Sequence, residues 1–215
     1  MPKLAATHRP TKLLFLPGAS GDVDLWRPVA ERLAHPAASS FMAYPGFGGA
    51  PAEPQLRGFD DLAARVVSAI DQPTALLAQS MGGVLALHAL LALRPEQRVL
   101  VTHLVLTVTS GGLDVAAEGG SEWRATFERQ RPELPRWFSD ERRDLSARLP
   151  ELRVPTLLLW GDADPISPVA VGEKLRRLLP RATLRVIAGG DHDLVQTRAQ
   201  EVTPLIAAHL AGLSA

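Results

Sequence analysis

The chain has 215 residues, 46% hydrophobic and 21% charged, and its 23 Lys and Arg balance 23 Asp and Glu. This composition suits one globular domain with a sizeable apolar core, and the zero net charge gives no reason to expect nucleic acid or a membrane surface as partner. The chain has no cysteine, which excludes disulfides, thiolate metal sites and a cysteine nucleophile. No apolar run approaches the roughly 20 residues of a membrane helix, so we expect a cytoplasmic protein.

Short apolar segments alternate with amphipathic ones along most of the chain. In chain order we expect a strand at 12–16, a helix at 24–34 capped by Asp24, a strand at 40–44, a helix at 59–70, a strand at 74–78, a helix at 81–93, strands at 103–108 and 156–160, a helix at 169–179, a strand at 183–188 and a helix from about 197 to 210. Uniformly apolar strands are typical of a parallel sheet with helices on both faces. The sequence therefore predicts an α/β fold with a doubly wound, mostly parallel sheet.

Residues 111–150 interrupt this alternation. The segment is rich in charges, carries aromatic side chains between arginines and glutamates, and has no strand pattern, whereas its stretch "WRATFERQ" is amphipathic. Because it falls between two sheet strands, we expect a short helical cap over one end of the sheet. The whole of 1–215 is then a single domain with this one insertion.

Three polar residues each follow a predicted strand: Ser80, Asp164 and His192. In a parallel sheet, ligands and reactive groups gather beyond the carboxyl ends of the strands. A serine hydroxyl needs a base within hydrogen-bond reach and a third group that orients this base. The order Ser, Asp, His is the one that a nucleophile-elbow hydrolase requires. The alternative for Ser80 is a helix cap followed by glycines for close packing.

Four short motifs resemble those of the α/β-hydrolase family, and the resemblance covers nearly the whole chain. They are "LPGASG" (16–21), similar to the family's HGxxG loop, "AQSMG" (78–82), similar to GxSxG, "VPTLLLWGDADPISP" with the acid-bearing loop, and "GGDHDL" with the histidine loop. The resemblance implies that Ser80 is the nucleophile, that His192 is the general base and later the acid, and that Asp164 fixes the histidine tautomer. Asp162 is the rival for this last role, and we expect it to cap its turn instead.

The backbone N–H groups of Ala19 and Met81 are expected to form the oxyanion hole. Met81 also lies at a predicted helix N-terminus, where the helix dipole favours an anion. Two residues depart from the family pattern. Ala78 stands where the family usually has glycine, at a position that requires a small side chain, and Pro17 replaces the histidine of the oxyanion loop, which changes how this loop is held.

The resemblance implies hydrolysis of a small-molecule ester or thioester through an acyl-enzyme on Ser80, with no metal and no cofactor. In size and short cap, the chain is similar to the carboxylesterases of biotin synthesis and the menaquinone-pathway synthase. We expect the insertion to roof an apolar pocket with some of five side chains: Leu113, Trp123, Phe127, Trp137 and Phe138.

Other functions stay open, because this fold hosts many chemistries. The same three residues could serve a non-hydrolytic lyase or a cofactor-free haloperoxidase, and a ligand-binding protein could keep the fold without turnover. The mixed charges of the insertion indicate a solvated face, and docking of an acidic carrier protein is the weaker interpretation. We expect a monomer or a homodimer.

Overall fold

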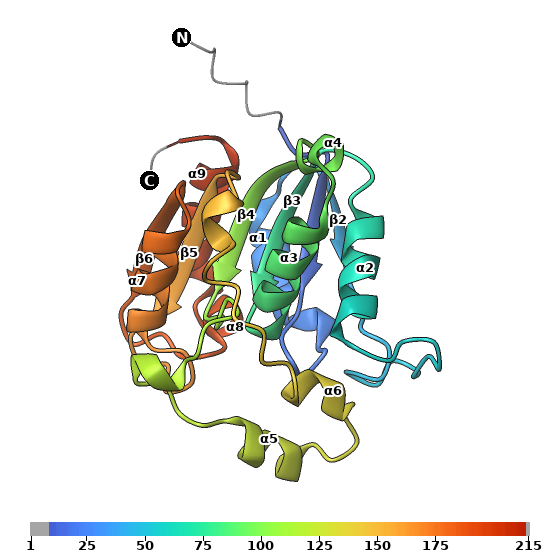
Figure 1. The fold of residues 1–215 in the computed structure, drawn as a ribbon. Coiled ribbons are helices and arrows are strands. Elements are labelled where there is room, and N and C mark those ends of the chain that lie inside the picture. Colours follow the sequence, from blue (N-terminus) through green and yellow to red (C-terminus); the bar gives the residue numbers. More distant parts are fainter. Residues whose placement is uncertain (1–8, 214–215) are drawn as a thin grey trace.

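The computed structural model describes residues 9–213, and this part of the chain forms a parallel six-stranded sheet between two layers of helices (Figure 1). The strands follow the order β2-β1-β3-β4-β5-β6 across the sheet, and every neighbouring pair is parallel. Their bounds are β1 Lys12–Leu16, β2 Ala38–Phe41, β3 Thr74–Gln79, β4 Val101–Thr107, β5 Thr156–Gly161 and β6 Ala182–Ile187. The prediction of an α/β fold with a doubly wound parallel sheet is confirmed.

Two apolar cores lie on opposite faces of this sheet, because successive strand residues point to opposite sides. Leu14 and Leu16 of β1 join the core that is covered by α2, α3 and α7, whereas Leu13 and Phe15 join the core that is covered by α1 and α9. These helices span α1 Arg27–Leu33, α2 Phe59–Ala69, α3 Met81–Ala92, α7 Val169–Leu178 and α9 Ala199–Leu210. All residues of β3, β4 and β5 are buried, as expected for strands covered on both faces.

The two edge strands are less buried than their apolar sequences suggested. Most residues of β2 and β6 are exposed or half-buried, since each pairs on one side only. The second strand was also expected at 40–44, but β2 covers Ala38–Phe41. Tyr44 leaves the sheet instead, and its fully buried hydroxyl donates a hydrogen bond to the Pro17 carbonyl at 3.0 Å.

One of the predicted helices is wrong in detail. In place of one helix from Asp24, a 3₁₀ turn at Val23–Trp26 precedes α1, and Asp22 caps this turn by accepting a hydrogen bond from the Asp24 N–H. The last predicted helix, from about 197 to 210, corresponds to α9. A short helix before it, α8 (Leu194–Thr197), was not predicted, and the backbone of Arg198, with a φ of −119°, separates the two helices. A short helix, α4 (Pro95–Arg98), was not predicted. The other elements agree with the prediction to within two residues.

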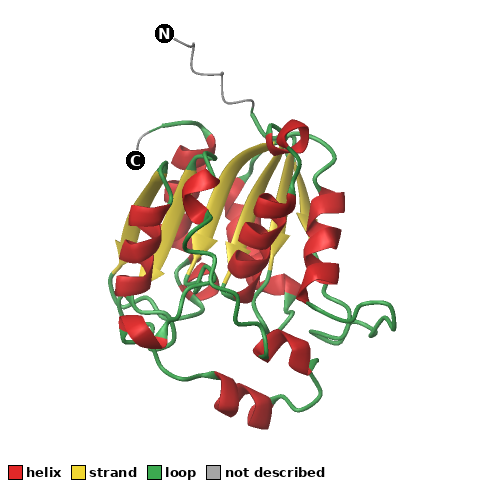
Figure 2. Cartoon of the chain, in the orientation of Figure 1, coloured by secondary structure: helices red, strands yellow, loops and turns green. Residues whose placement is uncertain are grey.

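Residues 111–150, hereafter the insertion, lie between β4 and β5 and pass beyond the carboxyl ends of the strands (Figure 2). The segment contains a 3₁₀ turn at Ala116–Glu118, the helices α5 (Arg124–Gln130) and α6 (Arg136–Ser139), and the start of a 3₁₀ turn at Leu149–Glu151, and it forms no strand. The Arg143 guanidinium joins its returning chain to α2, with contacts to Asp60 at 2.7 Å and to Glu141 at 2.5 Å. The insertion therefore lies at the carboxyl ends of the strands, where the predicted functional residues emerge.

Candidate active site

Ser80 lies between β3 and α3 in a sharp turn, with φ 52° and ψ −117°. Residues other than glycine rarely adopt a positive φ. The two glycines that follow allow α3 to approach the ends of the neighbouring strands closely. A Cβ on Gly82 would lie 2.5 Å from the Pro17 carbonyl oxygen, and a Cβ on Gly83 would lie 2.6 Å from the Thr109 Cβ. Close packing therefore explains both glycines. The strained turn presents the serine at the carboxyl end of β3.

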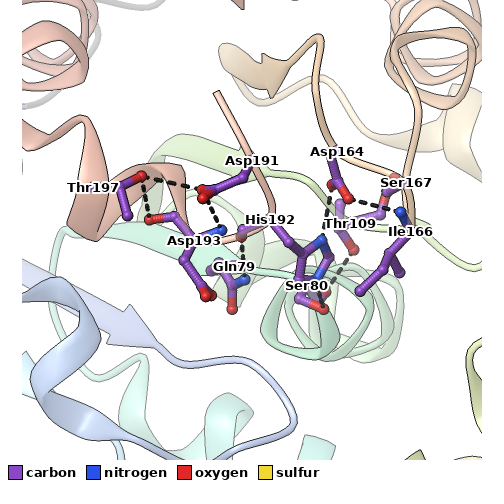
Figure 3. Close-up of polar contacts among 10 residues, drawn as sticks. All are labelled: Gln79, Ser80, Thr109, Asp164, Ile166, Ser167, Asp191, His192, Asp193 and Thr197. Carbon is purple, nitrogen blue, oxygen red and sulfur yellow. Dashed lines mark hydrogen bonds and ion pairs between the residues drawn. The ribbon is translucent and has the colours of Figure 1, made fainter. Parts of the chain in front are cut away.

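The imidazole of His192 connects Ser80 to Asp164 (Figure 3). His192 Nε2 lies 2.9 Å from Ser80 Oγ, and His192 Nδ1 lies 2.8 Å from Asp164 Oδ2. A carboxylate can only accept a hydrogen bond, so in the neutral ring the proton resides on Nδ1 and Nε2 accepts from the serine hydroxyl. The Asp164 side chain has no exposed surface, and its Oδ1 accepts from the Ile166 N–H at 2.8 Å. The structure thus brings together three residues that are up to 112 positions apart.

Two side chains hold the loop that carries His192. Gln79 donates from its amide nitrogen to the His192 carbonyl at 3.0 Å, and Asp162 accepts from the Gly189 N–H at 2.6 Å. Asp162 therefore binds the backbone of the adjacent loop, away from the imidazole. The structure places Asp164, and not its rival Asp162, in contact with the histidine.

The loop after β1 lies beside the serine turn. Ala19 and Met81, the two predicted oxyanion donors, both line the cavity that Ser80 faces. A backbone hydrogen bond from Gly21 N–H to the Gly18 carbonyl closes the loop at 3.0 Å. At the position where the family pattern has histidine, Pro17 is held through its carbonyl by the Tyr44 hydroxyl. Burial raises the pKa of this tyrosine well above its usual value, so its hydroxyl stays protonated and keeps donating.

A cavity of about 460 Å³ opens above Ser80 and His192, within the range of ligand pockets. Its walls come from the loops that follow β1, β4, β5 and β6, from the serine turn and α3, and from the insertion. Its apolar lining beside the serine consists of Leu25, Met81, Val84, Val108, Val115 and Ile166. Two carboxylates, Glu122 and Asp193, also line it, and none of its lining residues within 9–213 is lysine or arginine.

Of the five predicted pocket residues, the structure places Trp123, Phe127 and Phe138 on the cavity wall. Leu113 is buried in the core on the α3 side of the sheet instead. Trp137 packs edge-on against Phe47 and Phe59, with ring centroids 5.6 and 6.4 Å apart, and does not line the cavity. Trp137 was misplaced because neighbouring residues on a helix point to different sides.

Among the polar residues of the cavity wall that sequence reasoning missed are Thr126 and Gln130. With Trp123 and Phe127 they follow the spacing i, i+3, i+4, i+7, which is one face of α5. The helical spacing of these residues is visible in the sequence "WRATFERQ". The spacing alone does not say which face of the helix lines the cavity. The charged side chains of Arg124, Glu128 and Arg129 occupy the other positions of this helix and do not line the cavity.

Two other histidines pack against each other away from the serine. His103, near the start of β4, packs against His209 of α9 with ring centroids 5.1 Å apart.

Within residues 9–213, no group of three or more His, Cys, Asp or Glu side chains is arranged to hold a metal ion. No helix in this described range has the length and apolar content needed to cross a bilayer.

Comparison with known sequences places these observations in a family. The model of the Alpha/beta hydrolase family matches residues 13–205. The chain is 38% identical over 74 residues to a Synechocystis protein named "Putative non-heme chloroperoxidase" and 41% identical over 67 residues to the polyketide synthase ThaQ of Burkholderia thailandensis. These segments cover 34% and 31% of this chain, but only 25% and 3% of the two relatives, so the chain spans a small part of their length.

Solved structures share the fold over nearly the whole chain. An esterase from Exiguobacterium antarcticum has a TM-score of 0.76 and 17% identity, and the alignment covers 93% of this chain and 91% of that one. MenH from S. aureus has a TM-score of 0.73 and 19% identity, with 98% and 96% covered. At such identities the likeness concerns the fold alone. Because the family model spans all six strands and most of the helices, the chain belongs to the α/β hydrolase family.

Proposed function

We propose that this protein is a serine esterase that hydrolyses uncharged carboxylic esters or thioesters through an acyl-enzyme on Ser80. One observation carries the proposal: a hydrogen-bonded chain runs from Asp164 through His192 to the Ser80 hydroxyl, and this hydroxyl lines a largely apolar cavity. A nucleophile, its base and the group that orients the base are the parts that acyl transfer needs.

The proposed reaction has two halves. In the first, Ser80 Oγ attacks the carbonyl carbon while His192 Nε2 takes its proton, and the resulting oxyanion lies at the N–H groups of Ala19 and Met81. The carbon–oxygen or carbon–sulfur bond to the leaving group then breaks, and the histidine returns the proton to this group. In the second half, His192 takes a proton from water, the hydroxide attacks the acyl-enzyme, and the acid leaves as Ser80 regains its proton. Asp164 stabilises the imidazolium in both halves.

The cavity favours an uncharged substrate. Glu122 and Asp193 line it without any lysine or arginine among its described lining residues, so an anionic group close to the acyl chain would meet like charge. Arg124 of the insertion does not line the cavity: its guanidinium lies over the Trp123 ring, 4.8 Å from the ring centroid, and contacts Glu122 at 3.9 Å. In this proposal the insertion acts as a cap, and the α5 face with Trp123 and Phe127 holds the acyl chain.

Hydrolysis of p-nitrophenyl esters of increasing acyl length tests the proposal, with the wild type, Ser80→Ala and His192→Ala compared. Ser68→Ala is the matched control, because the Ser68 hydroxyl donates only to its own helix at the Ala64 carbonyl. We expect turnover by the wild type and the control, and almost none by the other two variants. Labelling by a fluorophosphonate should likewise require Ser80. Wild-type protein that is inactive on every ester and is not labelled would exclude the proposal.

A matched pair of substrates tests the preference for uncharged esters. p-Nitrophenyl butyrate and p-nitrophenyl hemisuccinate have acyl chains of similar length, but only the second ends in a carboxylate. We expect a kcat/KM at least about tenfold higher for the butyrate, because the two lining carboxylates repel the anion. Equal values for the two esters would contradict this preference while leaving the esterase proposal intact.

A second candidate is perhydrolysis, which the match to a protein named as a chloroperoxidase favours. In this reaction hydrogen peroxide, in place of water, attacks the acyl-enzyme, and a peroxy acid leaves. The same Ser80, His192 and Asp164 serve both reactions, so product analysis with and without peroxide distinguishes them. A lyase would instead form a product without incorporating water, and a ligand-binding protein would bind an ester without releasing alcohol.

A further inference from the structure

Thr109, two residues after β4, contacts the serine turn from the neighbouring strand. Its hydroxyl donates to the Ser80 carbonyl oxygen at 2.6 Å and accepts from the Gly111 N–H at 3.1 Å (Figure 3 shows the first contact). A carbonyl oxygen can only accept a hydrogen bond, so the single hydroxyl proton of Thr109 points to the Ser80 carbonyl. The hydroxyl oxygen is then the acceptor for the Gly111 N–H. Thr109 is completely buried, and water cannot replace it in either contact.

The carbonyl that Thr109 binds belongs to the same peptide unit as the Met81 N–H. The peptide unit is planar, so a contact that fixes the direction of its carbonyl oxygen also fixes the direction of its N–H. A hydrogen bond to the carbonyl further polarises the amide and strengthens the N–H as a donor. Met81 N–H is one of the two donors proposed for the oxyanion. Thr109 is therefore joined to the oxyanion hole through one rigid group.

Three features of the surrounding structure determine where Thr109 lies. Its carbonyl oxygen accepts from the Ser167 hydroxyl at 3.2 Å, which connects it to the loop that carries Asp164. The preceding residue, Val108, has φ 43°, a conformation that a β-branched residue rarely adopts and that surrounding contacts must maintain. Gly83 leaves room on the remaining side, because a Cβ there would lie 2.6 Å from the Thr109 Oγ1.

We propose that Thr109 is a positioning residue of the oxyanion hole: its hydroxyl aims and polarises the Met81 N–H through the Ser80 carbonyl. This inference rests on the proposed function, since it assigns a role in the same acyl transfer. Thr109 acts on the charge that develops in the transition state and touches no substrate. Its loss lowers kcat and leaves KM nearly unchanged.

The test compares Thr109→Val with Thr107→Val. The Thr107 side chain is also completely buried on β4, but its hydroxyl has no hydrogen-bond partner within the described residues, so the second variant removes a hydroxyl that bonds nothing. Thr109→Ser and Thr109→Ala form a second pair that differs only in the hydroxyl, and it isolates the contact even where valine does not fit. The readouts are kcat and KM on a p-nitrophenyl ester and the Ki of an alkyl trifluoromethyl ketone, whose adduct with Ser80 carries an oxyanion.

We expect Thr109→Val to lower kcat about tenfold with KM within about twofold of the wild type, the size of one lost hydrogen bond in the transition state. The Ki of the ketone should rise by the same factor. Thr109→Ser should retain most of the activity that Thr109→Ala loses, and Thr107→Val should match the wild type. The inference is overturned if Thr109→Val keeps the wild-type kcat and Ki, or if Thr107→Val loses as much. A wild type that neither hydrolyses esters nor reacts with a fluorophosphonate overturns the proposed function instead.

Discussion

The side-chain amide of Gln79 donates a hydrogen bond to the backbone carbonyl of His192 at 3.0 Å, across 113 positions of sequence. Gln79 is the last residue of β3 and directly precedes the serine, so the strand that presents Ser80 also holds the loop that presents His192, its proposed base. The Gln79 side chain is almost fully buried, which keeps water from competing for the His192 carbonyl. The distance between the hydroxyl and the imidazole is thus set by contacts within the body of the protein.

Gln79→Met keeps the length of this side chain and removes the donor. We expect kcat/KM to fall about tenfold, because the loop with His192 loses one buried hydrogen bond and its carbonyl is left unpaired. Gln72→Met is the control. Gln72 lies just before the other end of the same strand, where its side chain accepts from the Thr11 hydroxyl in an exposed position. Equal activity of Gln79→Met and wild type would show that the loop is held without this bond.

Asp164 and Asp162 differ in what their side chains bind, and the two asparagine variants should therefore differ in activity. Asp164→Asn offers a neutral amide to His192 Nδ1 and favours the wrong tautomer, so we expect kcat to fall roughly 10³- to 10⁴-fold. Asp162→Asn retains an oxygen that accepts from the Gly189 N–H, and its activity should stay within about threefold of the wild type. Ester hydrolysis by the two purified variants decides the assignment, and a greater loss in Asp162→Asn would reverse it.

The sheet and the order of the polar residues could be predicted from sequence because they depend on local patterns. Uniform apolar runs identified the inner strands, and a residue directly after such a strand must emerge at its carboxyl end. Contacts between distant segments could not be predicted in this way. The bond from Thr109 to Ser80 and the bond from Tyr44 to Pro17 depend on how separate elements meet, and no spacing in the sequence encodes them. Trp137 was misplaced for the same reason, since "RWFS" does not say which aromatic faces the cavity.

Phe127 and Trp137 both belong to the insertion, but only Phe127 lines the cavity. We expect Phe127→Ala to raise KM for long acyl chains or to shift the preferred length upward, because the wall of the acyl pocket recedes. Trp137→Ala should lower the free energy of unfolding by roughly 2 kcal/mol through lost contacts with Phe47 and Phe59, with little change in the preferred acyl length. Chain-length profiles and urea unfolding measured on both variants test this division, and identical profiles for Phe127→Ala and the wild type would contradict it.

Gly83→Ala tests the close approach of α3 to the end of β4. Alanine usually stabilises a helix interior, but here its Cβ would lie 2.6 Å from the Cβ of Thr109. We expect a net loss of about 1–3 kcal/mol in the free energy of unfolding and a lower kcat, since the new methyl group displaces Thr109 from the Ser80 carbonyl. Gly58→Ala is the control, because its Cβ would meet no atom within 4 Å, and its stability should change by at most about 0.5 kcal/mol. If Gly83→Ala is instead more stable than the wild type, α3 can move away from the end of β4 at little cost, and the prediction is wrong.

Stability should also fall in acid because of His103, which is 2% exposed and packs against His209. Burial, followed by the positive charges of its neighbours His209, Arg181 and His35, lowers the pKa of His103 to about 4.

In the unfolded chain the same imidazole regains its ordinary pKa near 6.5. Between about pH 6.5 and 4 the unfolded state therefore binds a proton that the folded state does not, and the free energy of unfolding decreases as the pH falls through this range. Burial also lowers the pKa of His209, which adds to the same slope. His103→Leu should flatten the decrease between pH 6.5 and 4, as measured by urea unfolding at a series of pH values. His35→Leu should flatten it less, because burial and the charge of Arg9 lower the pKa of the half-buried His35 in the same direction. An unchanged slope in His103→Leu would assign the acid sensitivity to other groups.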